Sequence, residues 1–170
     1  MKKFFKISVL VFTIALLTAS CKPLEEQIAI NGCELESLES VSLEAGLMTF
    51  GTVLTLDAAN TSCSDISLKK LNATILSKSG KEVATVTFSG KKGEKNPTLH
   101  HRSSEAVAVP LTVSFDNPLS ALSLASMALE DYGKKGYTVN YDCTLRAGCL
   151  AKRFVGNNVP IEEIVKMFDK

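Results

Sequence analysis

Five cysteines and two histidines are the side chains of this chain best suited to nucleophilic, redox or metal-binding chemistry. His100 and His101 are adjacent, and neighbouring residues of an extended chain point to opposite sides, so we do not expect them to chelate one metal ion. The cysteines lack the close pairs, such as Cys-x-x-Cys, that zinc sites use. A Gly-x-Ser-x-Gly elbow and a phosphate-binding loop are also absent from the sequence. The sequence therefore predicts no catalytic residue, no metal site and no cofactor.

The first cysteine, Cys21, closes a segment with the layout of an export signal. Three lysines open this segment, at Lys2, Lys3 and Lys6. Residues 7–17 are almost wholly apolar and are too few to span a bilayer of about 30 Å as a helix. The run Leu17-Thr18-Ala19-Ser20-Cys21 then resembles the bacterial lipobox. We expect residues 1–20 to be a signal peptide and Cys21 to become the lipidated first residue. The alternative is a free cysteine beside an ordinary cleavage site.

The residues after Cys21 bear on where the anchored protein resides. In bacteria of the enteric type, an Asp directly after the lipidated cysteine retains a lipoprotein at the inner membrane. Lys22 occupies this position here, so the outer membrane is the expected location. The protein could face the periplasm or the cell surface. Three of the 19 Lys and Arg residues lie in the signal segment, which leaves a slight excess of the 18 acidic residues. This balance predicts no nucleic-acid partner. The expected partners are the membrane, through Cys21, and a protein of the envelope.

Four cysteines remain as disulfide candidates: Cys33, Cys63, Cys143 and Cys149. Export to an oxidising compartment favours disulfides, and four cysteines allow three pairings. Cys143 and Cys149 flank a possible turn at 146–148, which could bring them face to face and leave Cys33 to pair with Cys63. The spacing leaves the other pairings open.

Alternating apolar and β-branched residues predict about seven strands, separated by turn signals at 79–81, 133–136 and 156–158. The predicted strands are 37–44, 48–59, 66–76, 81–89, 106–115, 137–145 and 149–155. Because proline cannot donate to a strand ladder, Pro110 predicts an edge or a bulge. Strands of this number and spacing favour an all-β antiparallel sandwich.

Two helices are expected beside the strands. Asn117 can cap a helix with Pro118 at its first position, and apolar residues at helical spacing extend it over 118–132. A short second helix is expected from Pro160. The chain thus divides into a signal peptide (1–20), a tether (21–36) and one domain (37–170).

The order of these elements resembles the late-embryogenesis-abundant type 2 family, also called the WHy domain. The resemblance is carried by Asn60, by residues 71–76 before Gly80, by 107–113 with Asn117-Pro118, and by 137–139 with 159–161. It implies an immunoglobulin- or fibronectin-III-like sandwich without catalytic residues. It also implies a role in binding or in protection under desiccation and stress. The four cysteines of the domain are not part of the family pattern.

These observations favour a non-enzymatic envelope protein that acts through contacts with a partner. One alternative is a stress-protection protein like the plant relatives. Another is a glycan- or small-ligand-binding module, which the absence of Trp argues against. A basic loop is formed by Lys91, Lys92, Lys95, His100, His101 and Arg102. We expect a solvated hairpin end there, and contact with anionic headgroups or polysaccharide is the functional alternative.

Overall fold

A computed structural model of the chain describes residues 27–44, 47–88, 95–119, 121 and 134–161. The predicted signal peptide and Cys21 lie outside these residues, as does most of the predicted helix 118–132. Within the described part, no helix is long and apolar enough to cross a membrane.

Eight strands make up the described part of the chain. They are β1 (Ile28–Glu44), β2 (Leu47–Asn60), β3 (Ile66–Leu76), β4 (Glu82–Phe88), β5 (Thr98–Leu99), β6 (Ser103–Phe115), β7 (Thr138–Ala147) and β8 (Leu150–Pro160). Five of the predicted strands match β2, β3, β4, β6 and β7 closely, because each alternates between buried and more exposed positions along its length. The prediction of an all-β antiparallel fold is confirmed.

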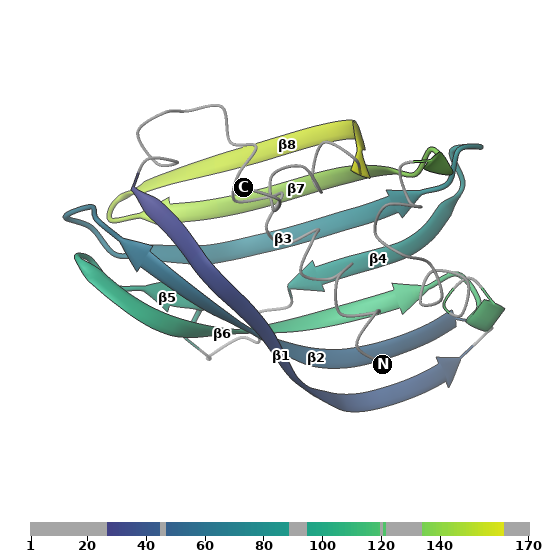
Figure 1. The fold of residues 1–170 in the computed structure, drawn as a ribbon, viewed down its shortest axis with the longest axis horizontal. Helices are drawn as coiled ribbons and strands as arrows, with labels where there is room; N and C mark the ends of the chain where they lie inside the picture. The colour runs from purple at the N-terminus through teal and green to yellow at the C-terminus, as the bar shows by residue number, and fades with distance from the viewer. Residues whose placement is uncertain (1–26, 45–46, 89–94, 120, 122–133, 162–170) are drawn as a thin grey trace.

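The strands form one hydrogen-bonded sheet in the order β1-β2-β6-β4-β3-β7-β8, with β5 beside β3. All of its pairs are antiparallel. The sheet curls on itself, as Figure 1 shows, so that β1, β2 and β6 face β3, β7 and β8. We call the first three strands the lower wing and the last three the upper wing.

Strand β4 joins the two wings at one end of the sheet only. It pairs with residues 71–76 of β3 and with residues 111–115 of β6. At the other end, β6 and β3 continue past β4 without pairing to each other, and the short strand β5 lies between them (Figure 1). The wings are therefore closed together at the β4 end and separate at the β5 end.

The inner face of the curl holds the hydrophobic core. Its largest fully buried side chains are Phe115, Leu54, Leu71, Ile75, Ile161, Val86 and Val109. The rings of Phe50 and Phe115 stack at 5.6 Å between centroids. This apolar face is what the alternating sequence pattern predicts, since every second residue of a strand points to the same side.

The sequence analysis predicts an edge or a bulge at Pro110, whereas the structure places it in β6, which lies between β2 and β4 and pairs with β2 without a register shift. Pro110 pairs with Val53 of β2 on one side, and the ladder between β6 and β4 ends one residue away, at Leu111. The residues that follow Phe88 on the other side of β6 lie outside the described part of the chain.

Several predicted boundaries need correction. Strand β1 begins at Ile28, so residues 28–36 belong to the sheet rather than to a tether. The predicted turn at 156–158 is instead a bulge inside β8, between the pairs Tyr141–Gly156 and Val139–Val159. Asn158 adopts a φ of 54° there, and its N–H donates to Asn140 Oδ1 at 2.7 Å. This side-chain acceptor lets the strand continue through residues whose composition is typical of a turn.

The chain after β6 begins a helical turn at Pro118 and Leu119. The N–H of Ala121 donates to the carbonyl of Asn117 at 3.2 Å. Ile161, directly after β8, is helical and fully buried. The remaining residues of both predicted helices lie outside the described residues.

Candidate functional site: an apolar pocket between the wings

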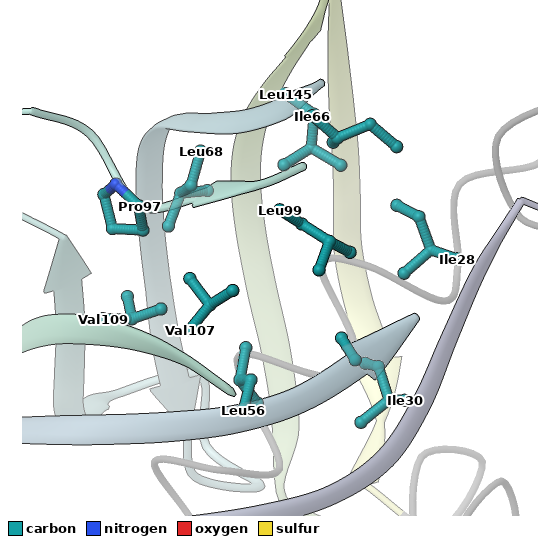
Figure 2. Close-up of a pocket in the computed structure, with 11 residues that line it drawn as sticks. Ile28, Ile30, Leu56, Ile66, Leu68, Pro97, Leu99, Val107, Val109 and Leu145 are labelled. Atoms are coloured by element: carbon teal, nitrogen blue, oxygen red, sulfur yellow. The ribbon is translucent and has the colours of Figure 1, made fainter. Parts of the chain in front are cut away.

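A pocket opens between the two wings at the β5 end of the sheet (Figure 2). Its cavity volume is about 50 Å³, and its mouth is open to solvent. The lining comes from both wings and from the segment around β5: Ile28, Ile30, Leu56, Ala58, Ile66, Leu68, Pro97, Leu99, Val107, Val109 and Leu145. Every lining side chain is aliphatic or proline, so the pocket offers dispersion contacts and no side-chain hydrogen bond.

Strand alternation places these side chains in the pocket. On β3, Ile66 and Leu68 are buried, whereas Ser67 between them lies on the other side of the strand. Strand β5 extends this wall, because Ile66 pairs with Leu99 and the N–H of Leu68 donates to the carbonyl of Pro97 at 2.9 Å. The wall of β3 and β5 thus has an apolar face toward the pocket and a polar face toward solvent.

A buried asparagine ties the end of the pocket together. Asn60 is 1% exposed and lies at the end of β2. Its Nδ2 donates to the carbonyl of Ser64 at 2.9 Å and to that of Leu99 at 3.3 Å. Its Oδ1 accepts from the N–H and the hydroxyl of Ser62, at 2.9 and 2.6 Å. One amide therefore links β2, the loop before β3, and the β5 segment that lines the pocket.

The outer face of the same wall forms a shallow polar groove. Its lining residues are Ser67, Lys69, Lys95, Asn96, Thr98 and His100. The hydroxyls of Ser67 and Thr98 lie 2.9 Å apart and join β3 to β5. Lys95, His100, His101 and Arg102 of the predicted basic loop are in the described part of the chain, whereas Lys91 and Lys92 are outside it.

The two histidines each have their own carboxylate. His100 Nδ1 lies 2.9 Å from Glu105 Oε1, and His101 Nδ1 lies 2.8 Å from Asp65 Oδ1. Hydrogen bonds from the histidine side chain and backbone lower the pKa of Asp65, and the backbone N–H of His100 is the main cause that lowers the pKa of Glu105. No group of three or more His, Cys, Asp or Glu that could hold a metal ion occurs among the described residues. His100 and His101 lie in the connection between β5 and β6, and each contacts a different carboxylate.

The cysteines do not pair as the sequence analysis suggests. Cys63, Cys143 and Cys149 are free thiols in the structure. Cys143 is fully buried and lies opposite Phe154, because the hairpin turn consists of Gly148 and Cys149 rather than residues 146–148. Cys149 therefore occupies the turn itself, and a bridge to Cys143 is not formed.

The remaining candidate cysteine, Cys33, lies on β1 opposite Leu56. Its suggested partner Cys63 follows the Asn60 end of β2, four residues of β2 beyond Leu56, so the structure does not bring these two cysteines together. Burial raises the pKa of the Cys143 thiol to about 12, and the charge of Asp142 adds to the effect. A thiol with so high a pKa is a poor nucleophile and a poor partner for disulfide exchange.

Asp142 forms two ion pairs on the outer face of the upper wing. Lys70 Nζ lies 2.5 Å from its Oδ2, and Arg153 Nε lies 2.7 Å from its Oδ1. The hydrogen bond from Arg153, followed by that from Lys70, lowers the pKa of Asp142 to about 2. Asp142 is thus a fixed anion that links β3, β7 and β8 across their outer face.

The comparisons with known proteins add a fold likeness and no family. No protein-family model matches the chain, and no curated protein sequence matches it significantly. A structural-genomics protein solved by X-ray crystallography is similar over 79% of this chain and 85% of its own, with 13% identity and a TM-score of 0.41. A protein from Archaeoglobus fulgidus is similar over 75% and 91%, with 13% identity and a TM-score of 0.42. A Bordetella pertussis protein named ApaA is similar over 76% and 88%, with 10% identity and a TM-score of 0.37.

The pocket is the part of the site that the sequence analysis missed. Its lining residues carry the same apolar alternation as the rest of the core, so no local signal separates them. The pocket could have been predicted from the lengths of the strands. Strand β4 has 7 residues, whereas β3 has 11 and β6 has 13, so β4 cannot pair with either neighbour along its whole length.

Proposed function

We propose that this chain is a bacterial lipoprotein, anchored to the outer membrane through lipidated Cys21, whose β-domain is a non-catalytic binding module of the envelope. The lipobox-like segment before Cys21 supports the anchor. The domain is an immunoglobulin- or fibronectin-III-like sandwich of the late-embryogenesis-abundant type 2 kind, in which the two wings correspond to the two sheets. Their face-to-face arrangement at the β5 end supports this assignment.

The observation that carries the binding role is the apolar pocket between the wings. Its cavity volume is only about 50 Å³, below the range of about 300–1,000 Å³ that is typical of sites for whole small molecules, so the pocket suits the end of a chain rather than a complete molecule. Because its lining has no hydrogen-bonding side chain and no aromatic ring, it suits an aliphatic chain and does not suit a sugar. The proposed occupant is the acyl chain of an envelope lipid.

The position of the pocket relative to the anchor favours a membrane lipid as the source of that chain. Ile28 and Ile30 line the pocket and lie shortly after Cys21 in the sequence. The seven residues that separate Cys21 from Ile28 span at most about 25 Å. The anchor therefore keeps the pocket within about one bilayer thickness of the membrane surface.

The anchor is tested by metabolic labelling with an alkyne fatty acid in a bacterium that expresses the full chain. The wild-type protein is expected to take up the label and to fractionate with membranes. The Cys21→Ala variant is expected to do neither. Equal labelling of both proteins would refute lipidation at Cys21.

The pocket is tested with the full chain carrying Cys21→Ala, so that no acyl anchor competes with the probe. A fluorescent fatty acid is titrated into this protein and into the same protein with Ala58→Leu, which fills the pocket. The matched control is Val155→Leu, at a position 52% exposed on β8. We expect at least a tenfold loss of affinity for the pocket variant and no change for the control, with thermal unfolding showing that both remain folded. Unchanged binding to a folded Ala58→Leu protein would contradict the proposal.

A further inference from the structure

The loop before β3 and the turn between β7 and β8 lie side by side at the β5 end of the sheet (Figure 1). The N–H of Gly148 donates to the carbonyl of Asp65 at 3.3 Å. A Cβ atom at Gly148 would lie 3.7 Å from the Cβ of Ser64. Gly148 and Ser64 are each next to a cysteine, because Cys149 follows Gly148 and Cys63 precedes Ser64.

The register of the sheet brings together the two segments that carry these cysteines. The last pair of β3 and β7 is Ile66 with Ala147, and the hydrogen bond from Gly148 to Asp65 continues the register by one residue. Gly148 and Cys149 then form the turn, and Cys63 lies two residues before Asp65. Both thiols are exposed, in contrast to the buried Cys143. We propose that Cys63 and Cys149 form a disulfide that ties the loop before β3 to the β7–β8 turn.

The alternatives are less well placed. Cys143 points into the core between Leu71 and Phe154, where no other cysteine lies opposite it. Cys33 pairs with Leu56, and four residues of β2 separate Leu56 from the Asn60 end where Cys63 lies. An extended chain rises by about 3.3 Å per residue, so the backbone of Cys33 is far beyond the Cα separation of 4.4–6.8 Å that a disulfide needs.

The bond forms by exchange with an oxidant that itself carries a disulfide, such as a thiol oxidase of the export compartment. The thiolate of one cysteine attacks a sulfur of the oxidant and releases one of its thiols. The thiolate of the other cysteine then attacks the mixed disulfide and releases the second thiol. The pair loses two protons and two electrons, and the oxidant is reduced to a dithiol.

The disulfide would close a long loop between β2 and β8 and fix the end of the pocket. Ile66 and Leu145 line the pocket and lie close to the two cysteines in sequence. Closing a loop of this length raises the midpoint of thermal unfolding by roughly 5–10 °C in a domain of this size. The inference rests on the proposed function in one respect only, because export to an oxidising compartment supplies the oxidant. The juxtaposition of the two segments comes from the fold.

The test uses the full-length protein, reduced and then oxidised with oxidised glutathione, alkylated, and digested with trypsin and a glutamate-specific protease. These cuts place Cys33 in residues 27–34, Cys63 in 45–69, Cys143 in 136–146 and Cys149 in 147–152. We expect mass spectrometry to find residues 45–69 joined to 147–152. The joined species should be lost in Cys63→Ser and Cys149→Ser and kept in Cys143→Ser. A link between any other two peptides, or none at all, would overturn the proposal.

A second arm separates this inference from the proposed function. Intact cells are treated with an alkylating agent before lysis, and the protein is analysed in the same way. A bond present both in cells and after glutathione oxidation supports the inference and the export. Free thiols in cells, with the bond formed by glutathione, support the juxtaposition and refute export to an oxidising compartment.

Discussion

The ring of Tyr141 lies directly over Gly156 of the neighbouring strand. A Cβ atom at Gly156 would come within 2.1 Å of Tyr141 Cε1 and 2.4 Å of its Cζ. The two residues are paired across β7 and β8, next to the bulge in β8. Tyr141 is buried, so its ring has little room to move aside. Gly156 therefore provides the space that the ring occupies at this edge of the core.

Replacing Gly156 with Ala should destabilise the protein by about 1–3 kcal/mol, because the added methyl group overlaps a buried ring. Urea unfolding of the Gly156→Ala variant measures this loss. The same substitution in a Tyr141→Ala background should cost far less, since the ring that it meets is gone. An equal cost in both backgrounds would show that the ring is not the cause.

The ion pairs of Asp142 should make a pH-dependent contribution to stability. The folded-state pKa of Asp142, about 2, is below its ordinary value of 3.8. The stabilisation is therefore fully present above about pH 4 and is lost as the pH falls toward 2. Because Lys70 and Arg153 are largely exposed, we expect only about 1 kcal/mol.

Urea unfolding of Asp142→Asn at pH 7 and at pH 2 measures this contribution. The variant should be less stable than the wild type at pH 7, and the difference should disappear at pH 2. Glu82→Gln, at an exposed position of β4, is the matched control and should shift stability by less than about 0.5 kcal/mol at either pH. A loss in Asp142→Asn that persists unchanged at pH 2 would argue against the ion pairs as its source.

Asn60→Asp should destabilise the end of the pocket. The carboxylate cannot donate to the carbonyls of Ser64 and Leu99, and it places a charge at a buried site. We expect a loss of about 1–3 kcal/mol in the free energy of unfolding. Asn157→Asp, at an exposed position of β8, should leave stability nearly unchanged. Hydrogen exchange at Leu68, whose N–H donates to Pro97, reports whether the β5 segment loosens, and unaltered protection would contradict the linking role of Asn60.

Ile75 tests the core beneath the place where β4 joins the two wings. Its side chain is fully buried, between the pairs with Ala84 and Val139. Truncation to Ala leaves a cavity and should cost about 2–5 kcal/mol. Val155→Ala, at an exposed position, should cost less than about 0.5 kcal/mol. Thermal and urea unfolding compare the two variants, and similar losses would show that the interior of the sheet is not packed as described.

The strands were predictable because alternation is a local property. The predicted segment 66–76 coincides with β3, whereas the prediction that Pro110 marks an edge or a bulge is wrong, because β6 lies between β2 and β4 and is regular there. The bulge at Gly156 was not predictable, because a Gly-Asn-Asn run is typical of turns. Only the ring of Tyr141 and the acceptor on Asn140 explain why the strand continues there.

The arrangement of the strands, and with it the pocket, depends on contacts between distant residues. Nothing in the composition of β4 indicates that it would join β6 to β3 and leave the other end of the wings apart. The pairing of the cysteines depends on such contacts as well. Cys143 and Cys149 are close in sequence, but one is buried in the core and the other occupies the turn. Cys63 belongs to the loop before β3, which the hydrogen bond from Gly148 to Asp65 joins to this turn.

The long edge strand β1 also determines how the domain responds to mechanical load. It is the first described strand after the proposed anchor, and it joins β2 through fourteen residue pairs. A pull along the strand from its N-terminal end strains these pairs together in shear, whereas a sideways pull would break them one after another. Resistance to force is a matter of unfolding rate. The proposed anchor would make β1 the strand through which force from the membrane enters the domain, and its fourteen pairs with β2 would bear that force.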